Sequence, residues 1–195
     1  MITPKTRKGN RTLEKILNAS IEVIEEKGFM NTSVSDITKR ANVAYGLFYY
    51  YFKDKYELLD QLIVKANREM RYYLKTHTEG IEDRIEKEKV GMREFLRWIK
   101  ENKRYYKIFI EAHVHRPQML IWHYNKLAER YSIGLREAMK KGEIITINPE
   151  LLSYVLIGIG EILGKRYILW SNNDISQELL TEVNKIIEKL LIPQN

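Results

Sequence analysis

Apolar residues recur every three to four positions along most of the chain, which is the period of an α-helix buried on one face. The first such stretch covers residues 12–27 and is followed by Gly28, a residue that commonly ends helices. The same period predicts further helices over residues 55–77, 82–99, 102–116, 119–140, 151–170 and 175–191. Residues 82–89 are strongly charged and are expected to be a solvated helix start. The pattern therefore predicts an all-α protein.

Two short amphipathic segments lie close together in residues 31–55. Ser33 or Ser35 is expected to cap the first segment, because serine side chains accept hydrogen bonds from the N–H groups of a first helical turn. The second segment covers residues 44–51, and Asp54 is a suitable N-cap for the long helix after it. Two short helices joined by a tight turn are the layout of a helix-turn-helix.

The composition supports a helical, basic protein. The 195 residues include only four prolines and ten glycines, which disfavours an all-β fold, and 33 Lys and Arg against 26 Asp and Glu give a net charge of +7. A basic surplus suits a polyanion such as DNA, although a basic surface with no nucleic-acid partner remains the alternative. No cysteine is present, so thiolate metal sites and cysteine nucleophiles are excluded.

The amino-terminal residues 1–11 contain Lys5, Arg7, Lys8 and Arg11 and no acid. Such a segment is expected either to be an arm that lies along phosphates or in a minor groove, or to be a frayed, solvated terminus. It has no apolar segment typical of a secretory signal, and no stretch of the chain is long and apolar enough to span a bilayer. A soluble, cytoplasmic protein is expected.

The second short helix is almost uncharged, and one face carries Tyr45, Gly46, Tyr49 and Tyr50. Tyrosine hydroxyls can donate to phosphates, and the rings can contact a thymine methyl group. The helix has no Arg, Asn or Gln, the usual bidentate readers of bases, so shape and apolar contacts are expected to contribute to specificity. The alternative is a structural aromatic cluster, and core packing is the preferred interpretation for its neighbours Phe48 and Phe52.

Several spaced motifs now resemble one family. The first helix ends in Lys-Gly-Phe, and a Thr-Ser-Val-x-Asp-Ile start, an Ala-x-Val turn and a Gly-Leu-Phe-Tyr-x-Tyr-Phe-x-Asp-Lys segment follow. Together, over residues 10–60, these motifs resemble the TetR family of transcriptional repressors. Asn42 replaces the usual Gly of the turn, which asparagine can do because it tolerates left-handed geometry. Ala44 replaces the Ser or Thr that often caps the second helix, so that cap is expected to be missing or supplied otherwise.

The resemblance implies a helix-turn-helix DNA-binding domain over residues 1–53 and a helical ligand-binding and dimerisation domain over residues 54–195. Positions expected to meet base edges in the major groove are Tyr45, Gly46 and Tyr49. Positions expected near sugar and phosphate are Leu47, Tyr50 and Tyr51. Ser35 is expected to reach a base or phosphate, and Lys55 to meet the phosphate backbone and to act as a hinge between sensing and binding.

The last two predicted helices, residues 151–170 and 175–191, resemble a self-association face. The first is apolar nearly all round and is expected to be buried on more than one side, with Gly158, Gly160 and Gly164 allowing close approach of a helix or ligand. Two copies would form a four-helix bundle, which suits a palindromic operator. The alternative is that these helices pack only within one chain.

An aromatic-rich middle section is expected to line an effector pocket, with plain core packing as the alternative. The candidate lining residues are Tyr73, Trp98, Tyr105, Phe109, His113, Trp122, Tyr124, Tyr131, Tyr154, Gly158 and Glu161. His113 or Glu161 would meet a polar group of the effector. His113 and His115 are two positions apart on a helix and face different sides, so no metal site is expected, and no cofactor is expected either.

The sequence thus predicts a dimeric, effector-responsive repressor that leaves its operator when a small hydrophobic or amphipathic ligand binds. A fatty acyl-coenzyme A is one expected effector, as in the fatty-acid-metabolism regulators of the family. The alternative effector is a planar cationic drug, as in regulators of multidrug efflux. A small helical enzyme or a protein-interaction module are alternatives of another class, but no nucleophile elbow, glycine-rich phosphate loop or metal motif supports an enzyme.

Overall fold

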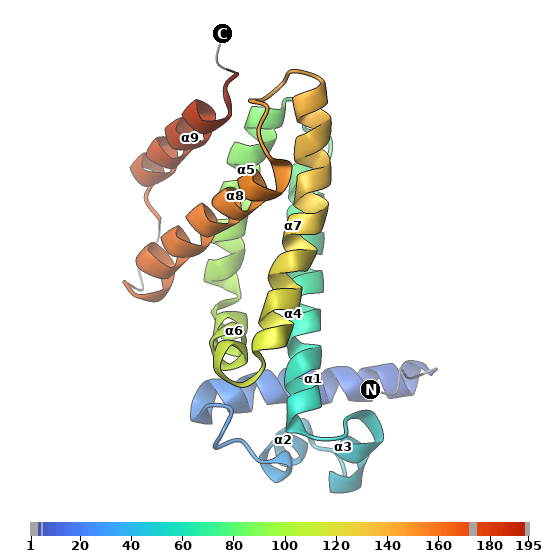
Figure 1. The fold of residues 1–195 in the computed structure, drawn as a ribbon. Coiled ribbons are helices and arrows are strands. Elements are labelled where there is room, and N and C mark those ends of the chain that lie inside the picture. The colour runs from blue at the N-terminus through green and yellow to red at the C-terminus, as the bar shows by residue number, and fades with distance from the viewer. Residues whose placement is uncertain (1–3, 5, 172–174, 194–195) are drawn as a thin grey trace. The chain divides into compact units, whose positions relative to one another are not determined.

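The structure is a computed structural model that describes residue 4, residues 6–171 and residues 175–193, and this part of the chain is all-α (Figure 1). The helices are α1 (Arg7–Lys27), α2 (Val34–Ala41), α3 (Tyr45–Tyr51), α4 (Lys55–Thr78), α5 (Arg84–Glu101), α6 (Lys103–His115), α7 (Pro117–Lys140), α8 (Pro149–Gly164), the π-helical turn η1 (Lys165–Leu169) and α9 (Gln177–Leu191). The predicted all-α fold class is confirmed. No helix of the described residues is both long and apolar enough to cross a membrane.

The chain divides into two compact units. The head unit consists of Met1–Asn67 and Arg104–His123, and the C-terminal unit consists of Arg68–Lys103 and Tyr124–Asn195. Helices α4 and α7 each contribute residues to both units. The predicted boundary between a DNA-binding and an effector-binding domain, between residues 53 and 54, stays a prediction. The compact units follow a different division, in which α6 joins the head unit from Arg104 on.

The head unit is built on α1, with α2 and α3 side by side beneath it (Figure 1). Its core consists of fully buried aliphatic and aromatic side chains from four helices and the connecting loops. They include Ile16, Ile24, Phe29, Ile37, Phe48, Phe52, Leu58, Leu59, Leu62 and Ile63. Since these residues fall at helical spacing in the sequence, the apolar stripes predicted for α1, α2 and α4 are the faces that are buried.

The expectation of an arm or a frayed terminus over residues 1–11 is wrong for residues 7–11. Helix α1 already begins at Arg7, because the Thr6 side chain accepts a hydrogen bond from the backbone N–H of Gly9 at 3.1 Å. This N-cap satisfies a backbone donor that would otherwise lack a partner at the start of the helix. Lys5 lies outside the described residues.

In the C-terminal unit, α5 packs against α8 and α9. Gly160 and Gly164 face α5: a Cβ at Gly160 would lie 2.8 Å from Phe95 Cδ1, and one at Gly164 would lie 2.5 Å from Ile99 Cδ1. The predicted close approach of a helix is therefore confirmed at these two glycines. At Gly158 a Cβ would meet nothing within 4 Å in the single chain.

Two expectations for this unit are corrected. The charged stretch of residues 82–89 is not solvated throughout, because Glu88 is only 5% exposed. The predicted helix over residues 151–170 ends its α-helical part at Gly164, and the π-helical turn η1 follows, where the Trp170 N–H donates to the Lys165 carbonyl at 2.9 Å. One side of α8 packs on α5, while Leu151, Val155 and Ile162 are exposed, so burial on more than one side is not reached within a single chain.

Candidate functional site

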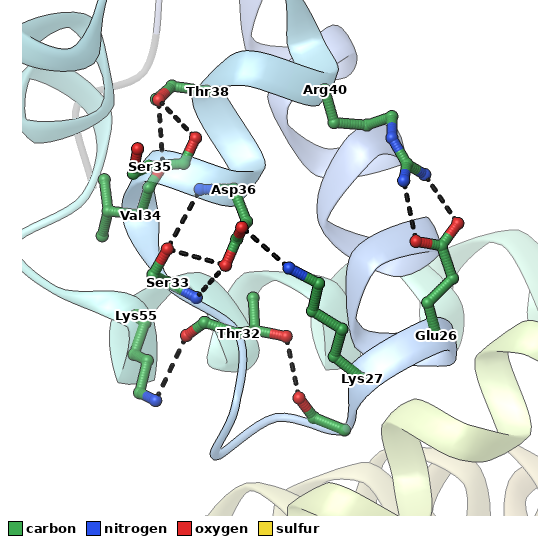
Figure 2. Close-up of polar contacts among 11 residues, drawn as sticks. Glu26, Lys27, Thr32, Ser33, Val34, Ser35, Asp36, Thr38, Arg40 and Lys55 are labelled. Carbon is green, nitrogen blue, oxygen red and sulfur yellow. Dashed lines mark hydrogen bonds and ion pairs between the residues drawn. The ribbon is translucent and has the colours of Figure 1, made fainter.

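Helix α2 is fixed at its start by a reciprocal capping box. The Ser33 hydroxyl accepts from the Asp36 N–H at 3.1 Å, and the Asp36 carboxylate accepts from the Ser33 N–H at 3.0 Å (Figure 2). Lys27 of α1 also donates to Asp36 at 2.8 Å. The hydrogen bonds from Lys27 and Ser33 hold the pKa of the Asp36 carboxyl well below its usual range. Of the two predicted caps, Ser33 is therefore the cap, and Ser35 is a half-buried residue of the first turn.

The far end of α2 is clamped to α1 by Arg40. Its guanidinium makes paired hydrogen bonds with Glu26, at 2.9 and 2.7 Å, and a third with Glu22 at 3.2 Å. Figure 2 shows the paired contact between Arg40 and Glu26. A bidentate arginine–carboxylate pair also fixes orientation, so α2 is held in a defined position on α1.

The turn between α2 and α3 depends on a left-handed residue. Asn42 has φ 52° and ψ 55°, as expected from the tolerance of asparagine for this region. Ala44, at the N-cap of α3, provides no side-chain hydrogen bond, so the predicted loss of that cap is confirmed. Helix α3 is therefore held in place by its packing within the head unit and not by a side-chain cap.

Helix α3 has one buried and one exposed side. Phe48 is fully buried, and its ring lies 5.3 Å from that of Phe52. On the opposite side Tyr45, Tyr49 and Tyr50 are each about half exposed, at 54%, 50% and 53%. The predicted division between core phenylalanines and outward-facing tyrosines is confirmed.

Two of the exposed tyrosines act on each other. The hydroxyl oxygens of Tyr45 and Tyr49 lie 3.2 Å apart, and their rings meet edge to face with centroids 5.6 Å apart. This hydrogen bond raises the pKa of the Tyr49 phenol above its ordinary value. Gly46 between them is exposed, and a Cβ there would meet nothing within 4 Å. The surface thus presents a hydroxyl pair beside an open backbone position, with the half-buried Leu47 next to it.

Tyr51 differs from its neighbours. It is only 4% exposed, and its hydroxyl donates to the backbone carbonyl of Gly9 in α1 at 3.1 Å. A side chain in this position holds α3 to α1, and we therefore leave Tyr51 out of the proposed set of DNA contacts. The sequence could not separate Tyr50 from Tyr51, because both are tyrosines on a seven-residue helix.

Lys55, the first residue of α4, lies over the loop between α1 and α2. Its ammonium donates to the carbonyl oxygens of Phe29, Met30 and Thr32 at 3.2, 3.0 and 3.4 Å, and it lies 4.8 Å from the centroid of the Phe29 ring. Figure 2 shows Lys55 directed to the Thr32 carbonyl. An ammonium has three N–H donors, and here each has a carbonyl to meet. These contacts fix the loop between α1 and α2. The expected phosphate contact of Lys55 stays a prediction.

The same loop is also fixed from α6 within the head unit. Phe29 N–H donates to Glu111 Oε1 at 3.0 Å, and its ring lies 5.1 Å from that of His115 and 5.2 Å from that of Tyr56. No local pattern indicated that α6 would hold this loop, because 82 positions separate Phe29 from Glu111.

Within the C-terminal unit, the tyrosines predicted to line an effector pocket direct their hydroxyls to polar side chains. Tyr73 donates to Glu94 at 3.1 Å, Tyr124 to Glu161 at 2.6 Å, and Tyr154 to Asn125 at 2.9 Å. Tyr131 donates to Glu88. Trp98 is buried, and Gly158 is exposed. Sequence reasoning missed the buried carboxylates Glu88 and Glu94. Glu88 stands in the charged stretch of residues 82–89, which is typical of a solvated helix, and Glu94 follows that stretch.

These carboxylates are compensated inside the unit. Arg84 pairs with Glu88 at 2.5 Å, and Arg97 pairs with Glu94 at 3.1 Å. Burial, followed by the nearby Glu88 charge, raises the pKa of Tyr131 well above its ordinary value. The tyrosine therefore stays a hydrogen-bond donor over the whole physiological pH range.

The other predicted effector residues lie in the head unit. Tyr105 is buried, Phe109 and Trp122 are half-buried, and His113 is exposed. The Phe109 ring lies 4.4 Å from that of His123, which is buried. The predicted set is thus divided between the two units. Over the described ranges, no group of three His, Asp or Glu residues could hold a metal ion.

Comparison with known proteins agrees with the geometry of the head. The sequence model of a family described as bacterial regulatory proteins, tetR family, matches residues 16–62, which covers the end of α1 through the start of α4. This chain carries a TetR-family domain. The TetR-type helix-turn-helix predicted from residues 10–60 is thereby confirmed.

Two curated relatives match part of the chain. The HTH-type transcriptional regulator YvdT of Bacillus subtilis is 41% identical over 80 residues, 41% of this chain and 40% of the relative. The fatty acid metabolism regulator protein of Bacillus subtilis is 35% identical over 79 residues, 40% of this chain and 39% of the relative. The chain thus spans less than half the length of the curated relatives that it matches.

Solved structures extend the likeness over nearly the whole chain. A protein from Clostridium perfringens described as a fatty acid metabolism regulator has a TM-score of 0.73 and 25% identity, over 92% of this chain and 100% of that one. A TetR-family protein from Syntrophomonas wolfei has a TM-score of 0.81 over 93% and 95% of the two chains, and at 22% identity it supports the fold alone. The helical C-terminal part is therefore also of the TetR type in its fold.

Proposed function

We propose that this TetR-family chain is a DNA-binding transcriptional repressor whose α3 enters the major groove. The observation that carries the proposal is the exposed face of α3, where Tyr45, Gly46 and Tyr49 stand outward while Phe48 anchors the helix in the core. A short helix that is held rigidly and presents hydrogen-bonding groups is what direct readout requires.

The chemistry of α3 indicates how it would read DNA. The Tyr45 and Tyr49 hydroxyls share a hydrogen bond, so the pair can offer one donor and further acceptor positions to a base edge or phosphate. Their rings suit a thymine methyl group, and Gly46 leaves room for a base edge or the sugar-phosphate backbone to approach. Leu47 and Tyr50 would lie against sugar and phosphate, and Ser35 at the start of α2 would meet a base or phosphate.

The proposed repressor acts as a homodimer on a palindromic operator. In support, α8 and α9 leave large apolar side chains exposed in the single chain: Leu151, Val155, Ile162 and Ile186. A two-fold arrangement of these helices would cover that face and give two heads for two half-sites.

The proposed effector is a molecule with an apolar chain, of which a fatty acyl-coenzyme A is the first candidate. The names of relatives from Bacillus subtilis and Clostridium perfringens as fatty acid metabolism regulators support this choice. The buried acids Glu88 and Glu94 each have an arginine partner, which weakens the rival proposal of a cationic drug. Effector binding would tilt α4, which contributes to both units, and so move the heads out of register with the two grooves.

A gel-shift assay with DNA from upstream of the chain's own gene tests DNA binding. The wild type should retain the duplex, and Tyr45→Ala should change which sequences are preferred. Tyr72→Ala is the matched control, because Tyr72 is 70% exposed on α4 in the C-terminal unit. Equal losses for Tyr45→Ala on the upstream duplex and on random DNA would contradict the role of Tyr45 as a reader.

A thermal-shift series over acyl-coenzyme A chain lengths tests the effector. Binding to the folded state alone stabilises it by RT ln(1 + L/Kd), where L is the ligand concentration, so the unfolding midpoint rises with the logarithm of this concentration once it exceeds the dissociation constant. A maximum at one chain length, with release of the retained duplex, is the expected result. No shift with any acyl chain length would overturn the acyl effector and leave DNA binding intact.

A further inference from the structure

The amino-terminal half of α1 carries a row of cations that no part of the proposed function uses. Arg7, Arg11 and Lys15 follow one another at intervals of four, and Lys8 precedes Lys15 by seven, so all four share one helix face. All four residues are exposed. No ion pair joins any of them to an acid within the described ranges.

Charge is segregated along this helix. The acids of its later turns are engaged: Glu22 and Glu26 bind Arg40, and Glu25 pairs with Arg104. Glu14, the acid closest to the cations in sequence, binds Lys65 of α4 at 2.6 Å. The positive charge of the first turns is therefore not neutralised by the helix itself.

The arrangement of these cations is not explained by helix stability. The N-terminal end of a helix carries a partial positive charge, so cations in the first turns lower its stability. Helix α1 has no acid in its first turn. An anionic partner at this face would remove that repulsion.

The first turn is held rigidly from the side opposite to the cations. Gly9 lies two positions from both Arg7 and Arg11, so it is on the other side of the helix. The Tyr51 hydroxyl at the end of α3 donates to the Gly9 carbonyl at 3.1 Å, and Pro4 covers Gly9 so closely that a Cβ there would lie 2.8 Å from Pro4 Cβ. Figure 1 shows α3 beneath the N-terminal half of α1.

We infer that the face formed by Arg7, Lys8, Arg11 and Lys15, here called the α1 cation face, binds the DNA phosphate backbone beside the base-reading helix. Tyr51 is the positioning residue that fixes this face relative to α3. DNA is favoured over an anionic lipid surface because the tether joins the cations to the reader helix, so that both move as one body. The inference rests on the proposed DNA binding and adds a sequence-independent contact to it.

The test is the salt dependence of DNA binding by four variants of the full chain. The first changes all four cations to glutamine, which removes the charge and keeps a similar helix propensity. Affinity for the upstream duplex and for a random duplex should fall by the same factor, about tenfold or more at ~0.1 M salt. The magnitude of the slope of log K against log salt should fall by about 0.9 for each lost phosphate contact. The matched control changes Lys75, Arg136, Lys140 and Lys189 to glutamine; all four are exposed in the C-terminal unit, and that slope should stay that of the wild type.

Tyr51→Phe isolates the tether, because it keeps the ring and removes only the hydroxyl. The slope should fall in the otherwise native chain and should not fall further when Tyr51→Phe is added to the four-glutamine variant. A merely structural role would instead lower the unfolding midpoint and leave the salt slope of the folded protein unchanged.

The outcomes separate the two proposals. If the wild type binds neither duplex, the proposed function fails. If the wild type binds and the four-glutamine variant has the wild-type slope, the α1 cation face is overturned while the proposed function stands. If the four-glutamine variant loses binding only to vesicles of phosphatidylglycerol and keeps its DNA slope, the face serves a lipid surface and the inference is likewise overturned.

Discussion

His123 predicts a pH dependence of stability that can be measured without any ligand. The residue is 3% exposed, and its Nδ1 lies 3.0 Å from Nδ2 of Asn67, which is 1% exposed. Because an amide nitrogen donates, Nδ1 must accept, which a protonated imidazole cannot do. Burial lowers the pKa of His123 to about 4 from its ordinary value of 6.5.

The direction and size of the pH dependence follow from the difference between the pKa of His123 in the folded chain and its pKa in the unfolded chain. In the unfolded chain His123 takes up a proton near pH 6.5, whereas in the folded chain it stays neutral down to about pH 4. The unfolded state therefore binds more protons in this window, and stability falls as the pH falls from about 6.5 to about 4. At about 1.36 kcal/mol per pH unit, the whole window is worth about 3 kcal/mol, of which about 2 kcal/mol is lost between pH 7 and pH 5.

Replacement by asparagine removes the titrating group and keeps a hydrogen-bond acceptor near the position of Nδ1. His123→Asn should be less stable than the wild type at pH 7 by about 2 kcal/mol, because it loses the ring that packs 4.4 Å from that of Phe109 and leaves a small cavity. Its free energy of unfolding should depend less steeply on pH. The two proteins are thus expected to approach equal stability near pH 5.

Urea denaturation followed by far-UV circular dichroism at pH 7, 6 and 5 is the assay, at one fixed protein concentration so that association does not change. Contributions from other acids are common to both proteins and cancel in the difference. His113→Asn is the control, since His113 is exposed, and it should follow the wild-type curve. Parallel pH curves for wild type and His123→Asn would refute the argument that His123 is neutral because it is buried.

Three further predictions concern the head and the C-terminal helices. Lys55→Met should lower both the thermal unfolding midpoint and the DNA affinity, because the ammonium binds three loop carbonyls. If the variant lost DNA affinity while its unfolding midpoint stayed unchanged, Lys55 would act through a phosphate contact alone. Ser33→Ala removes the capping box and should cost about 1 kcal/mol in urea denaturation, whereas Ser35→Ala should cost little. Gly160→Ala should lower the free energy of unfolding by about 1–3 kcal/mol, because its Cβ would lie 2.8 Å from Phe95. Gly158→Ala has open space around it in the single chain, so this variant should melt at or above the wild-type temperature. If α8 meets its copy at Gly158, the dimer dissociation constant of Gly158→Ala, measured by analytical ultracentrifugation, should change.

The helix-turn-helix could be predicted almost completely because its signals are local. The cap at Ser33, the left-handed Asn42 and the N-cap Asp54 each act within a few residues, and the apolar spacing of α1, α2 and α4 defines their buried faces. The two buried phenylalanines of α3 were also predictable, since side chains three to four positions apart share a face of a helix.

The effector residues could be predicted only as a composition. The tyrosines were found as an aromatic-rich set, but their carboxylate and amide partners lie 21 to 43 positions away. A glutamate in a charged stretch, such as Glu88, has the same sequence pattern whether it faces water or an arginine inside the protein. Only the packing of α5 against its neighbours decides which of these it does.

By itself, the sequence determined most of the helices and the TetR-type helix-turn-helix, because each depends on the period and spacing of neighbouring residues. Only the tertiary structure decided that Tyr51 turns inward while Tyr50 turns outward, and that Lys55 binds the loop before α2. It also decided that the basic residues 7–11 form a helix held by Tyr51 instead of a free arm. These outcomes rest on partners about 25 to 42 positions away, and no local propensity encodes such distant contacts.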